Sequence, residues 1–346
     1  MSQFTILIIK CGAAGDVIRT TSILKGLKKK YPSCRITWIT SSTNLPLIQH
    51  NPLIDVKLAL TEHILDELPE FFDLVISLDD ELAQCKIAAL KGKNKLIGAY
   101  LNENNQRTYT LDTEQWFGMG LLRPKEKGGK EKADQLKKEN KKTYQQHLSE
   151  MLNVEPSEPI LVYSEKERSF AQQFFDHHKL KNHDLIIGLN TGAGGRWKYK
   201  KLTEEKTAEL ALQLQQAFGA KVILFGGPEE MERNKKIMHL TGNKVIDAGC
   251  HHSLLAFAAL LDLCSILISS DSLAMHIGIA LKKQVIAFFG PTPSAEIELY
   301  GRGAKLIGHV PCIVCYLSDC DVRPTCMDTI TPKEIIEQVK QLISYP

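Results

Sequence analysis

The stretch from Ile268 to Thr292 constrains the fold of this chain most strongly. It consists of a short apolar run, a polar turn with Asp271 and Ser272, an apolar helical segment, and a second apolar run ending in Gly-Pro-Thr. A helix that starts directly after a buried strand presents its unpaired N–H groups and the positive end of its dipole at the edge of a sheet. The pattern therefore predicts a parallel α/β unit whose helix start suits a diphosphate, with Asp271 and His276 close enough in sequence to face one ligand.

A second strand–helix–strand pattern lies near the N-terminus. Residues 4–9 form an apolar run typical of a buried parallel strand, and a helix over 17–30 and a strand over 35–40 follow. The turn at 12–16 lacks both the dinucleotide fingerprint and the Gly-Lys-Ser/Thr phosphate loop. Asp16 stands at the carboxyl end of the first strand, where open α/β sheets bind ligands. Two interpretations stay open, a helix cap and a ligand-facing carboxylate.

Alternating strands and helices continue through both halves of the 346 residues, which predicts two domains. A proline-bearing segment at 155–159 separates the halves. We expect an α/β fold of two doubly wound, Rossmann-like domains over 1–156 and 157–330, with their carboxyl edges facing each other across a cleft. The remaining residues, 331–346, predict a C-terminal helix that packs back on the first domain.

Composition excludes several classes of protein. The net charge of +3 gives no reason to expect a nucleic-acid partner, and no apolar stretch reaches the length that spans a bilayer. The N-terminal apolar run is short and is interrupted by Lys10, so we expect no signal peptide and a cytoplasmic protein. A basic helical insertion is expected near 125–152, because the residues from Arg123 to Lys142 include nine Lys or Arg against four Asp or Glu. It is either a solvated insertion or a basic lip for an anionic acceptor or an acidic membrane surface.

Four of the nine cysteines are clustered near the C-terminus, at Cys312, Cys315, Cys320 and Cys326. Four thiols at this spacing could hold structural zinc or iron in a tetrahedral site. They could equally be reduced buried thiols or, less in keeping with the expected compartment, a disulfide.

Several motifs together resemble one enzyme family. They are residues 10–21, the glycine-rich turn at 191–197, the segment 225–230, the run 270–276 and the Phe-Gly-Pro-Thr of 289–292. In this order, and nearly end to end, they resemble the bacterial heptosyltransferases, which are glycosyltransferases of family 9.

The resemblance implies a GT-B arrangement in which the first domain binds the acceptor and the second binds a nucleotide sugar. It implies inverting transfer of a heptose from ADP-heptose to a lipopolysaccharide inner-core sugar or a related glycan, with no cofactor required for catalysis. Asp16 falls on the position of the general base, and Lys10, Gly15 and Arg19 fall beside the acceptor. Such an acceptor also implies peripheral contact with the cytoplasmic face of the inner membrane.

The same resemblance places donor-binding residues at Thr191, Gly192, Arg196, Lys200, Glu230, Asp271, Ser272, Leu273 and His276. Lys200 best matches the phosphate-contacting lysine, with Lys198, Lys201 and Arg196 as neighbouring alternatives. Asp271 is expected to bind hydroxyls of the donor sugar, since a carboxylate and a diphosphate repel each other. His276 matches the histidine of the family, and a structural role on its helix stays open.

Two departures from the family pattern concern the donor. Leu273 stands where the family has glycine, which permits close ligand approach, and Leu202-Thr203 replaces Trp-Pro. Three rival functions remain: transfer from another nucleotide sugar or to a protein acceptor, nucleotide-sugar binding by a non-catalytic partner subunit, and NAD-dependent dehydrogenation. The missing dinucleotide fingerprint disfavours the dehydrogenase.

Overall fold

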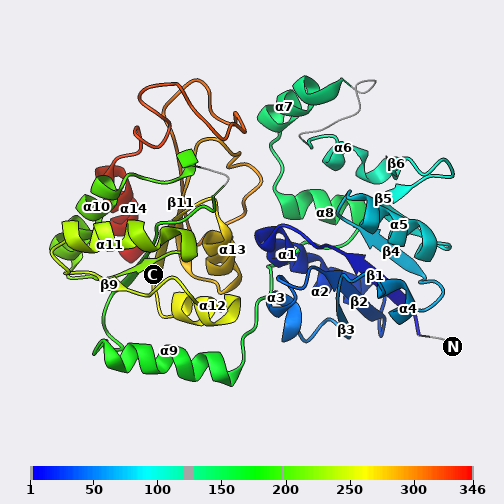
Figure 1. Ribbon diagram of the computed structural model, residues 1–346, viewed down its shortest axis with the longest axis horizontal. Helices are drawn as coiled ribbons and strands as arrows, with labels where there is room; N and C mark the ends of the chain where they lie inside the picture. The colour runs from blue at the N-terminus through cyan, green and yellow to red at the C-terminus, as the bar shows by residue number, and fades with distance from the viewer. Residues whose placement is uncertain (1–2, 121–127, 196–197, 345–346) are drawn as a thin grey trace. The chain divides into compact units, whose positions relative to one another are not determined.

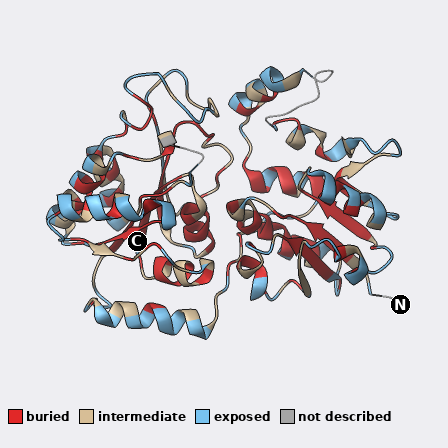
Figure 2. Cartoon of the chain, viewed as in Figure 1, coloured by how far each residue is buried: buried red, intermediate tan, exposed pale blue. Residues whose placement is uncertain are grey.

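The computed structural model describes residues 3–120, 128–195 and 198–344 and divides the chain into two compact units, Met1–Val162 and Tyr163–Pro346 (Figure 1). Each unit is an α/β domain, as expected, and the boundary lies a few residues beyond the predicted one. Figure 2 shows the strands of both units as buried layers, with helices that expose their outer faces. No helix in the described ranges is both long and apolar enough to cross a membrane.

The first unit contains a six-stranded sheet in the order β3-β2-β1-β4-β5-β6, parallel except for the antiparallel β6. Its strands are β1 (Thr5–Ile9), β2 (Arg35–Thr40), β3 (Val56–Ala59), β4 (Leu74–Ser77), β5 (Leu96–Leu101) and β6 (Arg107–Tyr109). Its helices are α1 (Ala14–Thr20), α2 (Leu24–Lys30), α3 (Pro46–Gln49), α4 (Ile64–Glu67), α5 (Leu82–Lys91), α6 (Glu114–Phe117), α7 (Gly129–Glu139) and α8 (Tyr144–Leu152). β1 is a central strand, with β2 and β4 paired on either side, and its residues Ile6, Leu7, Ile8 and Ile9 are fully buried, as is typical of parallel sheets whose two faces are covered.

The predicted helix over 17–30 is divided in the structure. A 3₁₀ turn, Thr21–Ile23, separates α1 from α2, and α2 ends before Tyr31 because the residue preceding a proline is biased away from helix. The basic insertion forms α7 and α8, with residues 121–127 outside the described ranges. A capping box between Thr143 and Gln146 starts α8, which packs against α1.

The second unit contains a fully parallel sheet in the order β12-β11-β10-β7-β8-β9. Its strands are β7 (Ile186–Asn190), β8 (Lys221–Phe225), β9 (Ile246–Asp247), β10 (Ile266–Ser270), β11 (Gln284–Phe289) and β12 (Gly303–Ile307). Its helices are α9 (Glu165–His177), α10 (Glu204–Phe218), α11 (Met231–Leu240), α12 (Leu254–Asp262), α13 (Leu273–Ala280) and α14 (Pro332–Ser344), with 3₁₀ turns at Lys198–Lys200 and Pro228–Glu230.

The C-terminal helix α14 corrects one expectation. It contacts α10, β11 and β12, and its fully buried residues Ile335 and Val339 belong to the hydrophobic core of the second unit. From the sequence we expect it on the first domain, because an amphipathic pattern shows that a face is buried but not what buries it.

Candidate functional site

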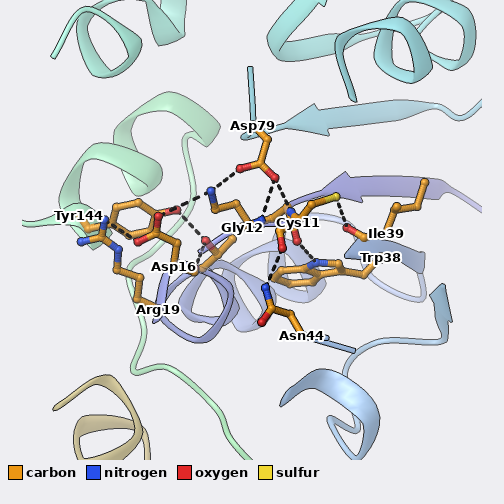
Figure 3. Close-up of polar contacts among 11 residues, drawn as sticks. Cys11, Gly12, Asp16, Arg19, Trp38, Ile39, Asn44, Asp79 and Tyr144 are labelled. Atoms are coloured by element: carbon orange, nitrogen blue, oxygen red, sulfur yellow. Dashed lines mark hydrogen bonds and ion pairs between the residues drawn. The ribbon is translucent and has the colours of Figure 1, made fainter. Parts of the chain in front are cut away.

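Charged side chains meet in the first unit where β1 and β4 end. These strands are neighbours in the sheet, with Ile9 opposite Ser77, so the residues that follow them lie close together. Lys10 donates a hydrogen bond from Nζ to Asp79 Oδ1, and the same Nζ lies 3.8 Å from Asp16 Oδ2 (Figure 3). The Lys10 side chain is 8% exposed, so this ammonium is almost fully removed from water.

Asp16 lies in the first turn of α1, but it is not the helix cap. The N-cap is Ala13, which makes no side-chain cap bond. The Asp16 side chain is about one-third exposed (32%), and its Oδ1 lies 2.9 Å from Arg19 Nη2. The carboxylate therefore faces two cations, Lys10 and Arg19, and keeps access to solvent. Gly15 is buried beside it in the same turn.

Helix α8 contributes Tyr144 to this cluster. The Arg19 guanidinium lies 3.9 Å from the centroid of the Tyr144 ring, and the Tyr144 hydroxyl lies 2.6 Å from Thr20 Oγ1. Burial raises the pKa of Tyr144, so its hydroxyl stays neutral. Sequence reasoning did not identify Tyr144 or Asp79 as site residues. The sequence does carry a signal for Asp79, because this acid directly follows the apolar run 74–78, whereas no local motif marks Tyr144.

The second unit has a cavity of about 520 Å³ at the carboxyl edge of its sheet. Loops after β7, β8, β9 and β10 contribute its walls, as expected for a ligand site in an open parallel sheet. Its lining residues are Asn190, Gly192, Ala193, Gly194, Gly226, Gly227, Pro228, Glu229, Glu230, Cys250, His252, Leu254, Phe257, Ser272, Leu273 and Ala274. Gly192, Glu230, Ser272 and Leu273 were predicted from the sequence.

The start of α13 opens on this cavity. Ser272 is the N-cap, and its hydroxyl makes no cap bond to the first N–H groups of the helix. That hydroxyl instead lies 3.1 Å from Asn190 Nδ2 and 3.0 Å from Ser269 Oγ. Asn190 also donates to the carbonyl of Gly192, which ties the glycine-rich turn to the helix start. A helix start arranged in this way can bind an anion.

Lys200, Asp271 and His276 form a cluster next to that helix start. Lys200 Nζ donates to the Asp271 carbonyl at 2.8 Å and to Asp271 Oδ2 at 2.9 Å, and His276 Nε2 lies 3.9 Å from Asp271 Oδ1. Burial by itself would raise the pKa of Asp271, but the charges of Lys200 and His276 outweigh it and lower this pKa to about 2. The structure thus brings these three predicted residues together, although they do not line the cavity.

Glu230 is a buried carboxylate in the cavity wall. It accepts a hydrogen bond from the Gly227 N–H at 3.0 Å and from Lys201 Nζ at 3.2 Å. A Cβ on Gly192 would lie 2.7 Å from Glu230 Oε2, so any larger residue at this position would require the Glu230 carboxylate to move. Two of the alternative lysines therefore have different carboxylate partners: Lys200 pairs with Asp271, and Lys201 pairs with Glu230.

Of two further residues predicted to bind the donor, the structure describes Thr191 but not Arg196. The Thr191 hydroxyl donates within the fold, to Asn234 Oδ1 at 2.6 Å and to the Phe225 carbonyl at 3.0 Å, and Thr191 does not line the cavity. Arg196 lies outside the described residues, as does the side chain of Lys198.

The clustered cysteines all lie in the segment between β12 and α14. All are free thiols; Cys326 is buried and Cys312 is exposed. Burial is the main cause that raises the pKa of Cys326 to about 11. Among the residues that the structure describes, no three His, Cys, Asp or Glu side chains are arranged to hold a metal ion.

Comparison with known proteins agrees with this architecture. A lipooligosaccharide heptosyltransferase 2 from Campylobacter jejuni is 29% identical over 188 residues, which are 50% of this chain, and the chain spans only 56% of that relative's length. A glycosyltransferase family 9 protein from Veillonella parvula has a similar fold, with a TM-score of 0.73, 20% identity, and coverage of 99% of this chain and 98% of the other. The E. coli ADP-heptose LPS heptosyltransferase II gives a TM-score of 0.68 at 18% identity and covers 99% of each chain.

The model of one protein family matches residues 121–324, more than half of the chain. Its description is glycosyltransferase family 9 (heptosyltransferase). The matched region runs from the basic insertion through the cavity of the second unit to the cysteine segment. The chain belongs to glycosyltransferase family 9, the heptosyltransferase family.

Proposed function

We propose that this protein is an inverting glycosyltransferase that moves a heptose from ADP-heptose to an inner-core sugar of lipopolysaccharide or a related glycan. The observation that carries the proposal is the cavity of the second unit, which the uncapped start of α13 adjoins. A cavity of this size suits a nucleoside diphosphate sugar, and the helix start suits its diphosphate. The named relatives support a heptose donor, since one is called an ADP-heptose LPS heptosyltransferase II and another a lipooligosaccharide heptosyltransferase 2.

In the proposed reaction, the acceptor hydroxyl attacks the anomeric carbon of the donor. Asp16 takes the proton of that hydroxyl, the new glycosidic bond forms, and the bond to the diphosphate breaks to release ADP. One base and one displacement invert the anomeric centre without a covalent intermediate. The N–H groups at the start of α13 and the ammonium of Lys200 meet the charge that grows on the leaving diphosphate. These groups supply the positive charge, so we propose the transfer without a metal ion.

We place the acceptor on the first unit. Residues 123–142 carry nine Lys or Arg against four Asp or Glu, and lysines such as Lys132 and Lys138 are exposed on α7. Positive charge of this kind attracts phosphorylated glycans and anionic membrane surfaces. We therefore propose an anionic glycan as acceptor, reached by peripheral contact with the cytoplasmic face of the inner membrane.

Leu273 favours a second candidate, transfer from a different nucleotide sugar. This side chain lines the cavity at the first position of α13, where the resembling family has glycine. A leucine there reduces the space beside the diphosphate.

The thermal unfolding midpoint of the protein, measured with ADP, UDP, GDP or NAD at the same millimolar concentration, separates the two candidates. A ligand that binds only the folded state raises the free energy of unfolding by RT ln(1 + [L]/Kd), so the best-matched nucleotide gives the largest shift. A shift with ADP alone supports the ADP-sugar, whereas a shift with UDP or GDP alone overturns it.

Turnover of ADP-heptose by Asp16→Asn tests the proposed base. We expect the ADP-induced thermal shift to stay and turnover to fall at least about 100-fold, as is typical when a general base is removed. The matched control is Asp66→Asn, which removes an exposed carboxylate of the same unit, 84% exposed, and should act as wild type. Wild-type turnover in Asp16→Asn would remove Asp16 from the mechanism.

A further inference from the structure

Asp79 is a nearly buried acid with no role in the proposed reaction. It follows β4, and its side chain is 11% exposed. Its Oδ1 accepts a hydrogen bond from Lys10 Nζ, and its Oδ2 accepts from the N–H of Cys11 and, at 3.4 Å, from that of Gly12. Figure 3 shows this carboxylate above the turn that leads into α1. Asp79 therefore contacts both the backbone before Asp16 and the cation beside Asp16.

Lys10 lies between two carboxylates at unequal distances. Its ammonium is in hydrogen-bond contact with Asp79, whereas Asp16 Oδ2 is 3.8 Å away, too far for a hydrogen bond. A buried ammonium requires a close carboxylate, because it has lost its hydration. Asp79 thus determines where the Lys10 charge is located.

Among the residues that the structure describes, the charged and titratable groups around Lys10 and Asp16 come from four elements. They are Cys11 after β1, Arg19 on α1, Asp79 after β4 and Tyr144 on α8. Burial by itself would lower the pKa of Lys10, but Asp16 and Asp79 outweigh it and raise the pKa, so Lys10 stays a cation. Burial raises the pKa of Tyr144, and it raises that of Cys11 to about 12, so both groups stay neutral. In this described part of the first unit, two cations therefore face two carboxylates.

We propose that Asp79 is a positioning residue that holds the Lys10 ammonium away from Asp16 and so keeps Asp16 able to accept the acceptor's proton. The proposal rests on the proposed role of Asp16 as the base. Without the charge of Asp79, Asp16 is the carboxylate that the described residues still offer to the buried ammonium, which moves into direct contact with it. A carboxylate in such a pair is a weaker base, because the ammonium stabilises its ionised form.

The test compares Asp79→Asn with Asp80→Asn. Both variants remove one negative charge, at neighbouring positions, but Asp80 is bonded by the Tyr109 hydroxyl at 3.0 Å and lies 3.5 Å from Arg107 Nη1. In Asp79→Asn we expect kcat to fall about tenfold and the acidic limb of the kcat–pH profile to move down by about one pH unit, as for a carboxyl that gains a close cation. The KM for the nucleotide sugar should not change, since the donor cavity belongs to the second unit. Asp80→Asn should follow wild type in all three quantities.

Lys10→Met is a second variant, which tests the proposal even if the Asp79→Asn protein does not fold. Removing the Lys10 ammonium should move the acidic limb of the kcat–pH profile to higher pH. In the double variant Lys10→Met/Asp79→Asn, the second change should not lower that limb by the amount that Asp79→Asn lowers it in the wild-type background. An unchanged limb in Asp79→Asn, or an unchanged limb in Lys10→Met, overturns the proposal. Failure of the proposed base looks different, because Asp16→Asn then keeps wild-type turnover, and that result overturns both proposals together.

Discussion

Asp271 shows how a single carboxylate can be kept charged inside the second unit. Its side chain is 17% exposed, and it is held by Lys200 and His276. These partners lower the pKa of Asp271 to about 2, below its ordinary value of 3.8. A carboxyl group whose pKa is lower in the folded state than in the unfolded state stabilises the fold at pH values above its pKa in the unfolded state. The ionised form of Asp271 therefore contributes to stability as well as to the proposed donor site.

We expect the stability advantage of wild type over Asp271→Asn to depend on pH. It should be fully present above about pH 5 and should shrink by about 2 kcal/mol as the pH falls towards 2, since one pKa unit corresponds to about 1.4 kcal/mol. Urea unfolding of both proteins across this range measures the difference. Asp319→Asn, which changes an exposed acid of the same unit, is the control and should show no such trend. A difference that is constant with pH would contradict the lowered pKa.

Individual residues were predictable to the extent that local motifs contained them. Asp16, Glu230 and Asp271 each end a strand or start a helix, so sequence position alone puts them at the carboxyl edge of a sheet. Tyr144 could not be found in this way, because it reaches Arg19 from a helix more than a hundred residues further along the chain. Its role depends on how α8 packs against α1, which no local pattern encodes.

At the scale of elements, α14 separates what periodicity predicts from what packing decides. The Thr331-Pro332 start and the helical spacing of apolar residues predict the helix itself. They do not name the surface that covers its apolar face. In the structure that surface is α10, β11 and β12, because the chain returns across the edge of its own sheet.

We expect Ile335→Ala on α14 to lower the free energy of unfolding by about 3 kcal/mol, the usual cost of removing a fully buried isoleucine side chain. The matched control is Ile343→Ala on the same helix, where the side chain is 41% exposed and the change should cost less than about 0.5 kcal/mol. Chemical denaturation of the two variants measures both values. Equal costs would show that α14 is not part of the core of the second unit.

At the scale of the whole molecule, each unit has a hydrophobic core of its own. The first is built around residues such as Leu7, Val75 and Ile87, and the second around residues such as Ile187, Ile268 and Ile335. Two series of alternating strands and helices predicted this division from the sequence, because each parallel sheet must bury both faces under its own helices. The exact boundary was less predictable, since the residues around it form no strand or helix of their own.

Separate cores and a donor cavity within one unit lead to a prediction for calorimetry. We expect two unfolding transitions in calorimetry. ADP should raise the midpoint of only the transition that belongs to the second unit, since at one hundred times Kd it adds about 2.7 kcal/mol to that unit's free energy of unfolding. Ile335→Ala identifies that transition, since it weakens the core of the second unit and should lower the same midpoint. If ADP raises the other transition, the nucleotide binds the first unit and the donor cavity has been placed wrongly. A single transition for the whole chain would instead show that the two cores unfold together, so that binding to one stabilises both.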